Sequence, residues 1–214
     1  MKDESKEATP AAVPERAKQA GEIRARWAWV EPEVWTDRML TALERGVKGG
    51  KWFSLIDKVY AMPTLRKAFA RVKANRGAAG VDHQTIRMYD KRLEENLERL
   101  SRELLEGTYH PSGIRRVYID KPGSKERRPL GIPTVKDPLV HAAPRMVLEP
   151  IYVRDSAHES YGFRPGRGCK EALRRVDGLL KAGYTWVVDA DLKSYFDTIP
   201  QERLASIISE KVSD

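Results

Sequence analysis

The chain has 214 residues, with 39 Lys and Arg against 31 Asp and Glu, so its formal net charge is +8. This length allows one domain or one and a half, and the charge indicates a polyanionic partner, either nucleic acid or an anionic membrane surface. A single cysteine, Cys169, excludes a disulfide framework and a thiolate metal site. No apolar run reaches the length of a membrane span, and no signal peptide begins the chain, so we expect a cytoplasmic protein without a membrane partner.

The first half of the chain is predicted to be helical. Residues 1–22 are charged and have no apolar period, which predicts a disordered tail. Apolar residues at helical spacing predict helices over about 35–47, 63–72 and 84–106. Before the last of these, Asn75–Asp82 contains two glycines and small residues. They indicate a tight loop, either one that another backbone approaches closely or a plain connection between helices.

A basic hairpin is predicted over Arg115–Pro133, where two short apolar runs flank Pro122-Gly123-Ser124. Six of its residues are basic and two are acidic. Such a hairpin can place Lys and Arg over phosphate groups. The basic residues fit another interpretation equally well. In it, the hairpin is a solvated edge of a sheet, and its lysines prevent other strands from pairing with it.

Helices are predicted on either side of a second basic segment. The first runs from Thr134 to about Leu148, and Pro144 in its interior should cost about 3 kcal/mol or force a kink. The loop Ser160–Gly168 follows, rich in Gly, Pro and Arg and bearing aromatic side chains, a composition that suits a nucleic-acid strand. Further helices are expected over 169–180 and from Pro200 onward.

A β-branched, aromatic run beginning at Trp186 predicts a buried strand, and it ends in a carboxylate, Asp191. Such a strand end is a rigid mount for a ligand of Mg²⁺, which prefers carboxylate and carbonyl oxygens. Two other interpretations stay open. One is a core strand that turns at a solvated aspartate, and the other is a D-x-D enzyme, such as a glycosyltransferase that binds a sugar nucleotide and Mn²⁺ through Asp189 and Asp191.

The order of these motifs resembles that of bacterial group II intron reverse transcriptases, the intron-encoded maturases. The resemblance runs from about Trp27 to the end of the chain. The matching segments are the glycine loop, the hairpin, the arginine loop and the aspartate strand, and the most specific matches are Lys121–Gly123, Arg128–Pro133 and Tyr161–Arg167.

The resemblance implies an α+β fold, an incomplete right-hand polymerase of mostly helical fingers with a β-hairpin and the first palm strand, Thr185–Asp191. It divides the chain into a disordered tail (1–22), an N-terminal helical extension of the fingers (23–110) and the N-terminal part of a reverse transcriptase domain (111–214).

The resemblance also implies roles for residues around the aspartate. Asp191 would be the catalytic residue and a ligand of Mg²⁺, with the carbonyl of Leu192 as a second contact. Phe196 would exclude the ribose 2′-hydroxyl of the incoming nucleotide. Asp189 would be a neighbour of the metal site, and Asp197 would be structural.

The same resemblance assigns roles to the basic residues. Lys121 and Arg128 would hold the triphosphate of the dNTP, and Arg127 is a rival to Arg128 because the hairpin has one residue more than the family pattern. The hairpin and loop arginines would hold the RNA template and DNA primer, and these are Arg115, Arg116, Arg164 and Arg167.

The Tyr-x-Asp-Asp element of the family does not occur in these 214 residues. One aspartate is a poor site for two Mg²⁺ ions. We therefore expect a truncated or split portion that does not polymerise alone, with a complementing chain supplying the rest of the palm and the thumb. A non-catalytic, maturase-like RNA-binding fragment is the main alternative, and an inert pseudogene product is another.

Overall fold

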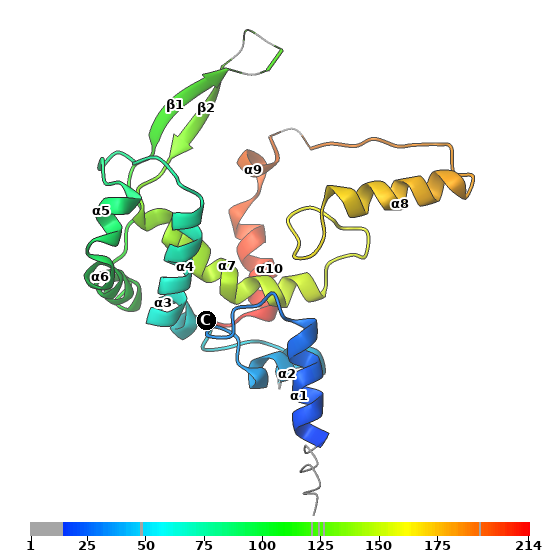
Figure 1. Ribbon diagram of the computed structural model, residues 1–214, viewed down its shortest axis with the longest axis horizontal. Coiled ribbons are helices and arrows are strands. Elements are labelled where there is room, and N and C mark those ends of the chain that lie inside the picture. Colours follow the sequence, from blue (N-terminus) through cyan, green and yellow to red (C-terminus); the bar gives the residue numbers. More distant parts are fainter. Residues whose placement is uncertain (1–14, 48, 121, 124, 126, 193) are drawn as a thin grey trace, which may run out of the picture.

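The computed structural model describes residues 15–47, 49–120, 122–123, 125, 127–192 and 194–214 (Figure 1). Helices dominate, and the described residues form one two-stranded sheet. The elements in chain order are α1 (Glu15–Arg26), α2 (Asp37–Arg45), α3 (Ile56–Tyr60), α4 (Met62–Ala74), α5 (Ile86–Asp90), α6 (Leu93–Leu105), β1 (Arg115–Asp120), β2 (Arg127–Ile132), α7 (Lys136–Arg154), α8 (Cys169–Lys181), α9 (Tyr195–Thr198) and α10 (Gln201–Lys211).

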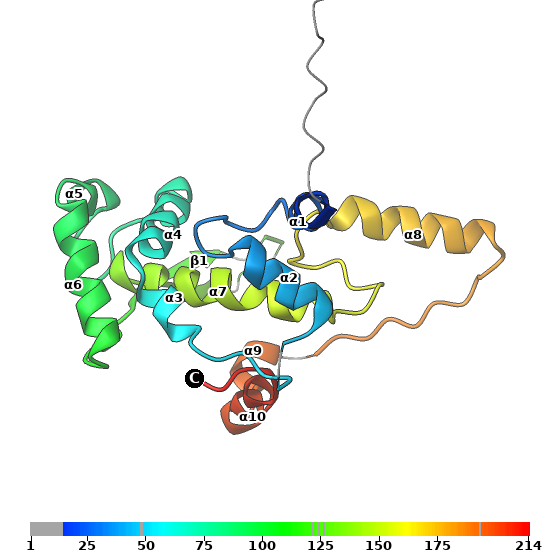
Figure 2. The ribbon, with the colours of Figure 1, turned by 90° about the horizontal axis from the view of Figure 1, so that it is seen from below.

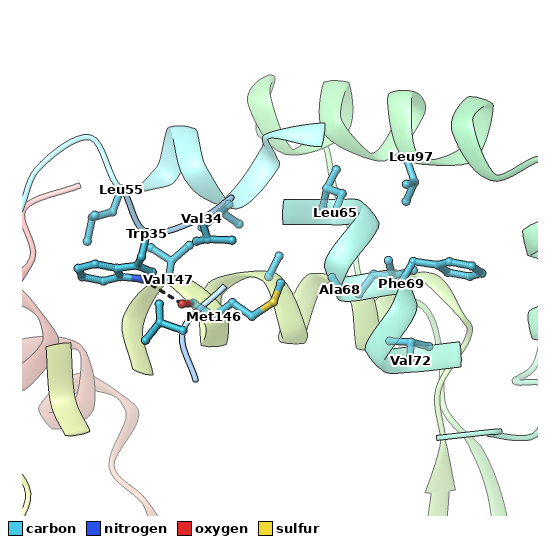
Figure 3. Packing of buried hydrophobic residues seen from close by; sticks show 14 of the residues in the cluster. Val34, Trp35, Leu55, Leu65, Ala68, Phe69, Val72, Leu97, Met146 and Val147 are labelled. Atoms are coloured by element: carbon cyan, nitrogen blue, oxygen red, sulfur yellow. Dashed lines mark hydrogen bonds between the residues drawn. The ribbon is translucent and has the colours of Figure 1, made fainter. Parts of the chain in front are cut away.

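The core lies between α7 and the N-terminal helices (Figure 3). Helix α4 packs on α7 and buries Leu65, Ala68, Phe69 and Val72, which have the spacing of one helical face. Helix α6 covers α4 from the other side through the buried Leu97 and Leu100. The helices predicted over about 35–47 and 63–72 are therefore confirmed as α2 and α4, each with an apolar face that is buried.

The long helix predicted over 84–106 is wrong in one respect, since it consists of two helices, α5 and α6. Arg92 between them has φ −125° and ψ 40°, which are not helical. The buried Asn96 side chain donates a hydrogen bond of 3.0 Å to the carbonyl of Tyr89 at the end of α5. The same carbonyl also accepts a backbone hydrogen bond of 3.2 Å from the N–H of Arg92, so both bonds tie the break to the end of α5. The disordered tail predicted over residues 1–22 is wrong in part, because helix α1 begins at Glu15. Residues 1–14 of that predicted tail lie outside the described part of the chain.

Helix α7 runs without interruption through Pro144 and Pro150, beyond the end predicted near Leu148. Because Pro150 has no N–H, the carbonyl of Met146 loses its donor four residues later. The buried indole of Trp35 supplies a donor instead, with its Nε1 3.2 Å from that oxygen (Figure 3). A side chain distant in sequence thus replaces one of the helix's own hydrogen bonds.

The β-hairpin predicted between the two helical regions is confirmed. Strands β1 and β2 pair antiparallel, with Arg115 opposite Ile132 and Asp120 opposite Arg127. The hairpin projects from the helical body beyond α4 and α7 (Figure 1).

The buried strand predicted over 185–191 is wrong for this structure. The segment is extended, but it pairs with no described strand, and Trp186 and Val188 are 97% and 93% exposed. Helix α8 before it buries none of its residues and reaches away from the body in both views (Figures 1 and 2). β-branched residues favour a strand only where a sheet and a core receive them, and no described element offers either here.

The C-terminal residues return to the body after this excursion. Trp52 accepts a backbone hydrogen bond from Ser213 and donates one to Lys211, at 2.8 and 2.7 Å. These bonds hold α10 beside the segment that precedes α3. Among the described residues, no helix combines the length and the apolar character needed to cross a membrane.

Candidate nucleic-acid interface

The base of the hairpin rests on the glycine loop Asn75–Asp82. Arg115 Nε donates a hydrogen bond of 3.0 Å to the carbonyl of Ala79. Gly80 is buried, and a Cβ atom there would lie 2.7 Å from both the carbonyl oxygen of Pro133 and the amide nitrogen of Thr134. The close backbone approach considered for this loop is confirmed, and the chain that approaches is the exit of the hairpin itself.

A cavity of about 340 Å³ lies beside this junction. The cavity lies between the helices α4 and α5 and the end of β2. Its wall includes the apolar side chains of Val72, Ile86, Leu130, Ile132 and Pro138.

The hairpin presents two faces with different arginines. On one face, Arg127 is already engaged, with Nε 3.3 Å from Asp120 Oδ1, Nη2 3.4 Å from the carbonyl of Tyr118, and its guanidinium 6.0 Å from the Tyr118 ring centre. On the other face, Arg128 lies opposite Ile119 and is exposed, without a described partner. Arg116, opposite Gly131 on the same face as Arg127, is also exposed and has no partner among the residues described. Lys121 lies outside the described residues.

The arginines of the Ser160–Gly168 loop are directed at backbone carbonyls. Arg164 donates to the carbonyls of Ala157, Ser160 and Val153 at 2.8, 3.2 and 3.1 Å, and the last of these belongs to the final turn of α7. Its Nε is buried without a partner among the described groups. Arg164 therefore holds the loop against the end of α7, and its contact with nucleic acid stays a prediction.

Arg167 shapes the tip of the same loop. It donates to the carbonyls of His158 and Ser160, and its guanidinium lies 5.7 Å from the centre of the Tyr161 ring. Phe163, one of the two aromatic residues of this loop for which exposure is predicted, is 94% exposed and has a positive φ of 54°. This exposed ring is the loop side chain best placed to stack on a base.

The aspartate segment does not assemble a metal site in this structure. Asp191 is exposed and forms no hydrogen bond or ion pair with a described residue. Leu192 and Phe196 are 68% and 83% exposed, and the Phe196 ring centre lies 5.5 Å from that of Tyr195. Within the described ranges, no three His, Cys, Asp or Glu side chains are grouped so that they could hold a metal ion. Among the described residues, the arrangement therefore does not supply the carboxylates that a pair of Mg²⁺ ions needs.

Residues 119–211, from the hairpin to α10, match the family model of reverse transcriptase (RNA-dependent DNA polymerase). This match defines the class of protein: a mostly helical chain whose basic hairpin and C-terminal segment are those of a reverse transcriptase. Members of that family use divalent metal ions and act on RNA and other nucleic acids.

Similar proteins narrow the class. The chain is 38% identical over 149 residues to the group II intron-encoded protein LtrA of Lactococcus lactis subsp. cremoris, an alignment covering 69% of this chain and 24% of that protein. It is 37% identical over 196 residues to protein YkfC of Escherichia coli, covering 89% and 47%. It is 35% identical over 149 residues to an uncharacterized 91 kDa protein in a cob intron of Schizosaccharomyces pombe, covering 69% and 18%.

The chain belongs to the group II intron-encoded reverse transcriptases and maturases. The resemblance based on the four ordered motifs is thereby confirmed. The chain spans less than half the length of these three relatives.

Proposed function

We propose that this chain is the fingers and the start of the palm of a right-hand polymerase that copies RNA into DNA during group II intron mobility and that binds intron RNA. Arg128 and Arg116 carry the proposal, because they are exposed on a hairpin whose base is held, have no partner among the described residues, and lie where a polyanion can reach them. The proposed organisation is a helical extension over 23–110 followed by the reverse transcriptase part from residue 111.

The hairpin is proposed to bind the triphosphate of a dNTP as well as the template. Arg128 is favoured over Arg127 for the triphosphate, because Arg127 is held by Asp120 and Tyr118. A planar guanidinium without a protein partner can form bidentate bonds to phosphate at no cost in broken ion pairs. Lys121 is proposed as the second phosphate ligand. Arg115 is proposed to contact nucleic acid while it keeps its hydrogen bond to the carbonyl of Ala79.

Asp191 and the carbonyl of Leu192 are proposed as ligands of Mg²⁺, and Phe196 as the residue that selects the nucleotide sugar, in the completed palm. Completion requires further strands beside residues 185–191, together with more carboxylates, which we propose come from a complementing chain. Since the described residues do not fit the metal pair, we assign no catalytic step to this chain alone.

A second candidate function is that of a non-catalytic, maturase-like RNA-binding fragment. The same observation favours it, because the described residues build the basic hairpin but no group able to hold a metal ion. The arginine loop suits either candidate, with Arg164 and Arg167 holding its shape and Phe163 open to a base.

RNA binding is expected to weaken steeply with salt, since each phosphate contact releases counterions. Arg128→Ala should reduce the slope of log affinity against log salt by about 1. Arg127→Ala is the matched control on the opposite face, and it should change the slope less because its guanidinium is already paired. Filter binding to a structured RNA between about 50 and 200 mM salt measures both slopes. A flat salt response, or equal effects of the two substitutions, would count against the proposal.

Primer extension tests the proposed lack of independent activity. The purified chain, supplied with an RNA template, a DNA primer, dNTPs and Mg²⁺, is expected to give no product, and Asp191→Ala should behave identically. The reason is that nucleotidyl transfer needs two metal ions, and a single carboxylate does not hold them. Product that disappears in Asp191→Ala would show that the chain completes the metal site by itself.

A further inference from the structure

A buried carboxylate joins the two ends of the hairpin. Asp137, in the first turn of α7, is 4% exposed. Its Oδ1 accepts hydrogen bonds from the hydroxyl of Tyr109 and the backbone N–H of Ser112, at 2.7 and 3.2 Å. Its Oδ2 accepts a bond of 2.7 Å from the hydroxyl of Thr134. Ser112 precedes β1 and Thr134 follows β2, so one side chain binds the entrance and the exit of the hairpin.

The network keeps Asp137 charged. Burial alone raises the pKa of its carboxyl group, but the hydrogen bonds from Tyr109, Thr134 and Ser112 outweigh burial and hold the pKa below its usual value. Burial, followed by the bond to this carboxylate, raises the pKa of Tyr109. Tyr109 is held in turn by Lys136, whose Nζ lies 5.3 Å from the ring centre and 2.9 Å from Glu103 of α6.

The hairpin acts as a lever about this point. A strand of six residues is roughly 20 Å long, so a tilt of about 10° at its base moves the tip by about 3.5 Å. The glycine loop supports the base through the contact of Gly80 with Pro133 and the bond from Arg115 to Ala79. The hydrogen bonds of Asp137 add a second restraint, because they fix both chain ends to the start of α7.

We propose that Asp137 is a positioning residue that sets the angle of the basic hairpin relative to the helical body. Its importance for RNA binding rests on the proposed function, whereas its effect on the hairpin angle does not. The angle matters because displacement of the outer end of the hairpin carries Arg128, which lies opposite Ile119 near that end, away from the phosphates that it is proposed to contact.

A distance measurement tests the angle directly. Spin labels are attached at Pro129→Cys on β2 and Glu98→Cys on α6, both exposed, in a Cys169→Ser background. The parent protein is expected to give one narrow distance distribution. Asp137→Asn and the milder, nearly isosteric Thr134→Val should broaden or shift it by a few ångströms, since each removes bonds at the hinge.

Thr134→Ser is the matched control, because it keeps the hydroxyl that donates to Asp137 and should restore the narrow distribution. Circular dichroism at the measuring temperature confirms that each labelled variant is folded. RNA affinity of Thr134→Val is expected to fall by about tenfold at low salt through lost phosphate contacts. An unchanged distance distribution in the folded Asp137→Asn and Thr134→Val proteins would overturn the proposal. A broadened distribution with full RNA affinity would retain the role of Asp137 and count against the hairpin as the RNA contact.

Discussion

Replacing Trp35 by alanine is expected to lower the free energy of unfolding by about 3–5 kcal/mol, the usual cost of deleting a buried aromatic side chain. Trp35 is completely buried, and its ring centre lies 5.2 Å from that of Trp52 in an edge-on contact. It packs between the N-terminal segment and the second half of α7 (Figure 3). Removing it opens a cavity and at the same time takes away the donor that satisfies Met146 beside Pro150.

Urea denaturation followed by far-UV circular dichroism, a signal that does not rely on tryptophan fluorescence, measures this loss of stability. Two further substitutions separate the effect of the cavity from that of the lost hydrogen bond. Trp35→Phe keeps most of the apolar volume but leaves the Met146 carbonyl without its donor, which should cost about 1–3 kcal/mol. Trp186→Ala makes the same deletion at a side chain that is 97% exposed, and it should change stability by less than about 0.5 kcal/mol. Equal losses at the two tryptophans would contradict the burial described for both.

Helical elements with one apolar face could be predicted from the sequence because the pattern itself carries the information. The residues Leu65, Phe69 and Val72 of α4 recur with the helical period, and the structure buries all three. The passage of α7 through Pro150 could not be predicted in this way. The carbonyl freed there is satisfied by the indole of Trp35, 111 residues before Met146, and no local pattern reveals a donor at that distance.

The candidate site could be predicted only in part, for a related reason. The hairpin forms from residues close together in the sequence, so two short apolar runs around Pro122-Gly123-Ser124 are enough to predict it. The strand expected to end at Asp191 requires other strands beside it, and Val188 at 93% exposure shows that no described part of the chain supplies them. The proposed choice of Arg128 over Arg127 as the triphosphate ligand could not be made from the sequence either. It rests on the ion pair between Arg127 and Asp120, which forms because these two residues lie opposite each other on one face of the hairpin.

Substituting Gly80 with alanine is expected to destabilise the protein by about 1–3 kcal/mol, as overpacking of a close contact does. The added methyl group would lie 2.7 Å from the backbone of Pro133 and Thr134, and backbone atoms cannot move aside as a flexible side chain does. Relief requires the glycine loop and the exit of β2 to separate. That movement would also strain the bonds from Arg115 to Ala79 and from Thr134 to Asp137.

Gly77→Ala is the control, because Gly77 is exposed in the same loop and a Cβ atom there meets nothing within 4 Å. Its effect should stay within about 0.5 kcal/mol in the same urea titration. If the glycine loop holds the hairpin, Gly80→Ala should also weaken RNA binding while Gly77→Ala leaves it unchanged. Equal stability of the two variants would contradict the close backbone contact described at Gly80.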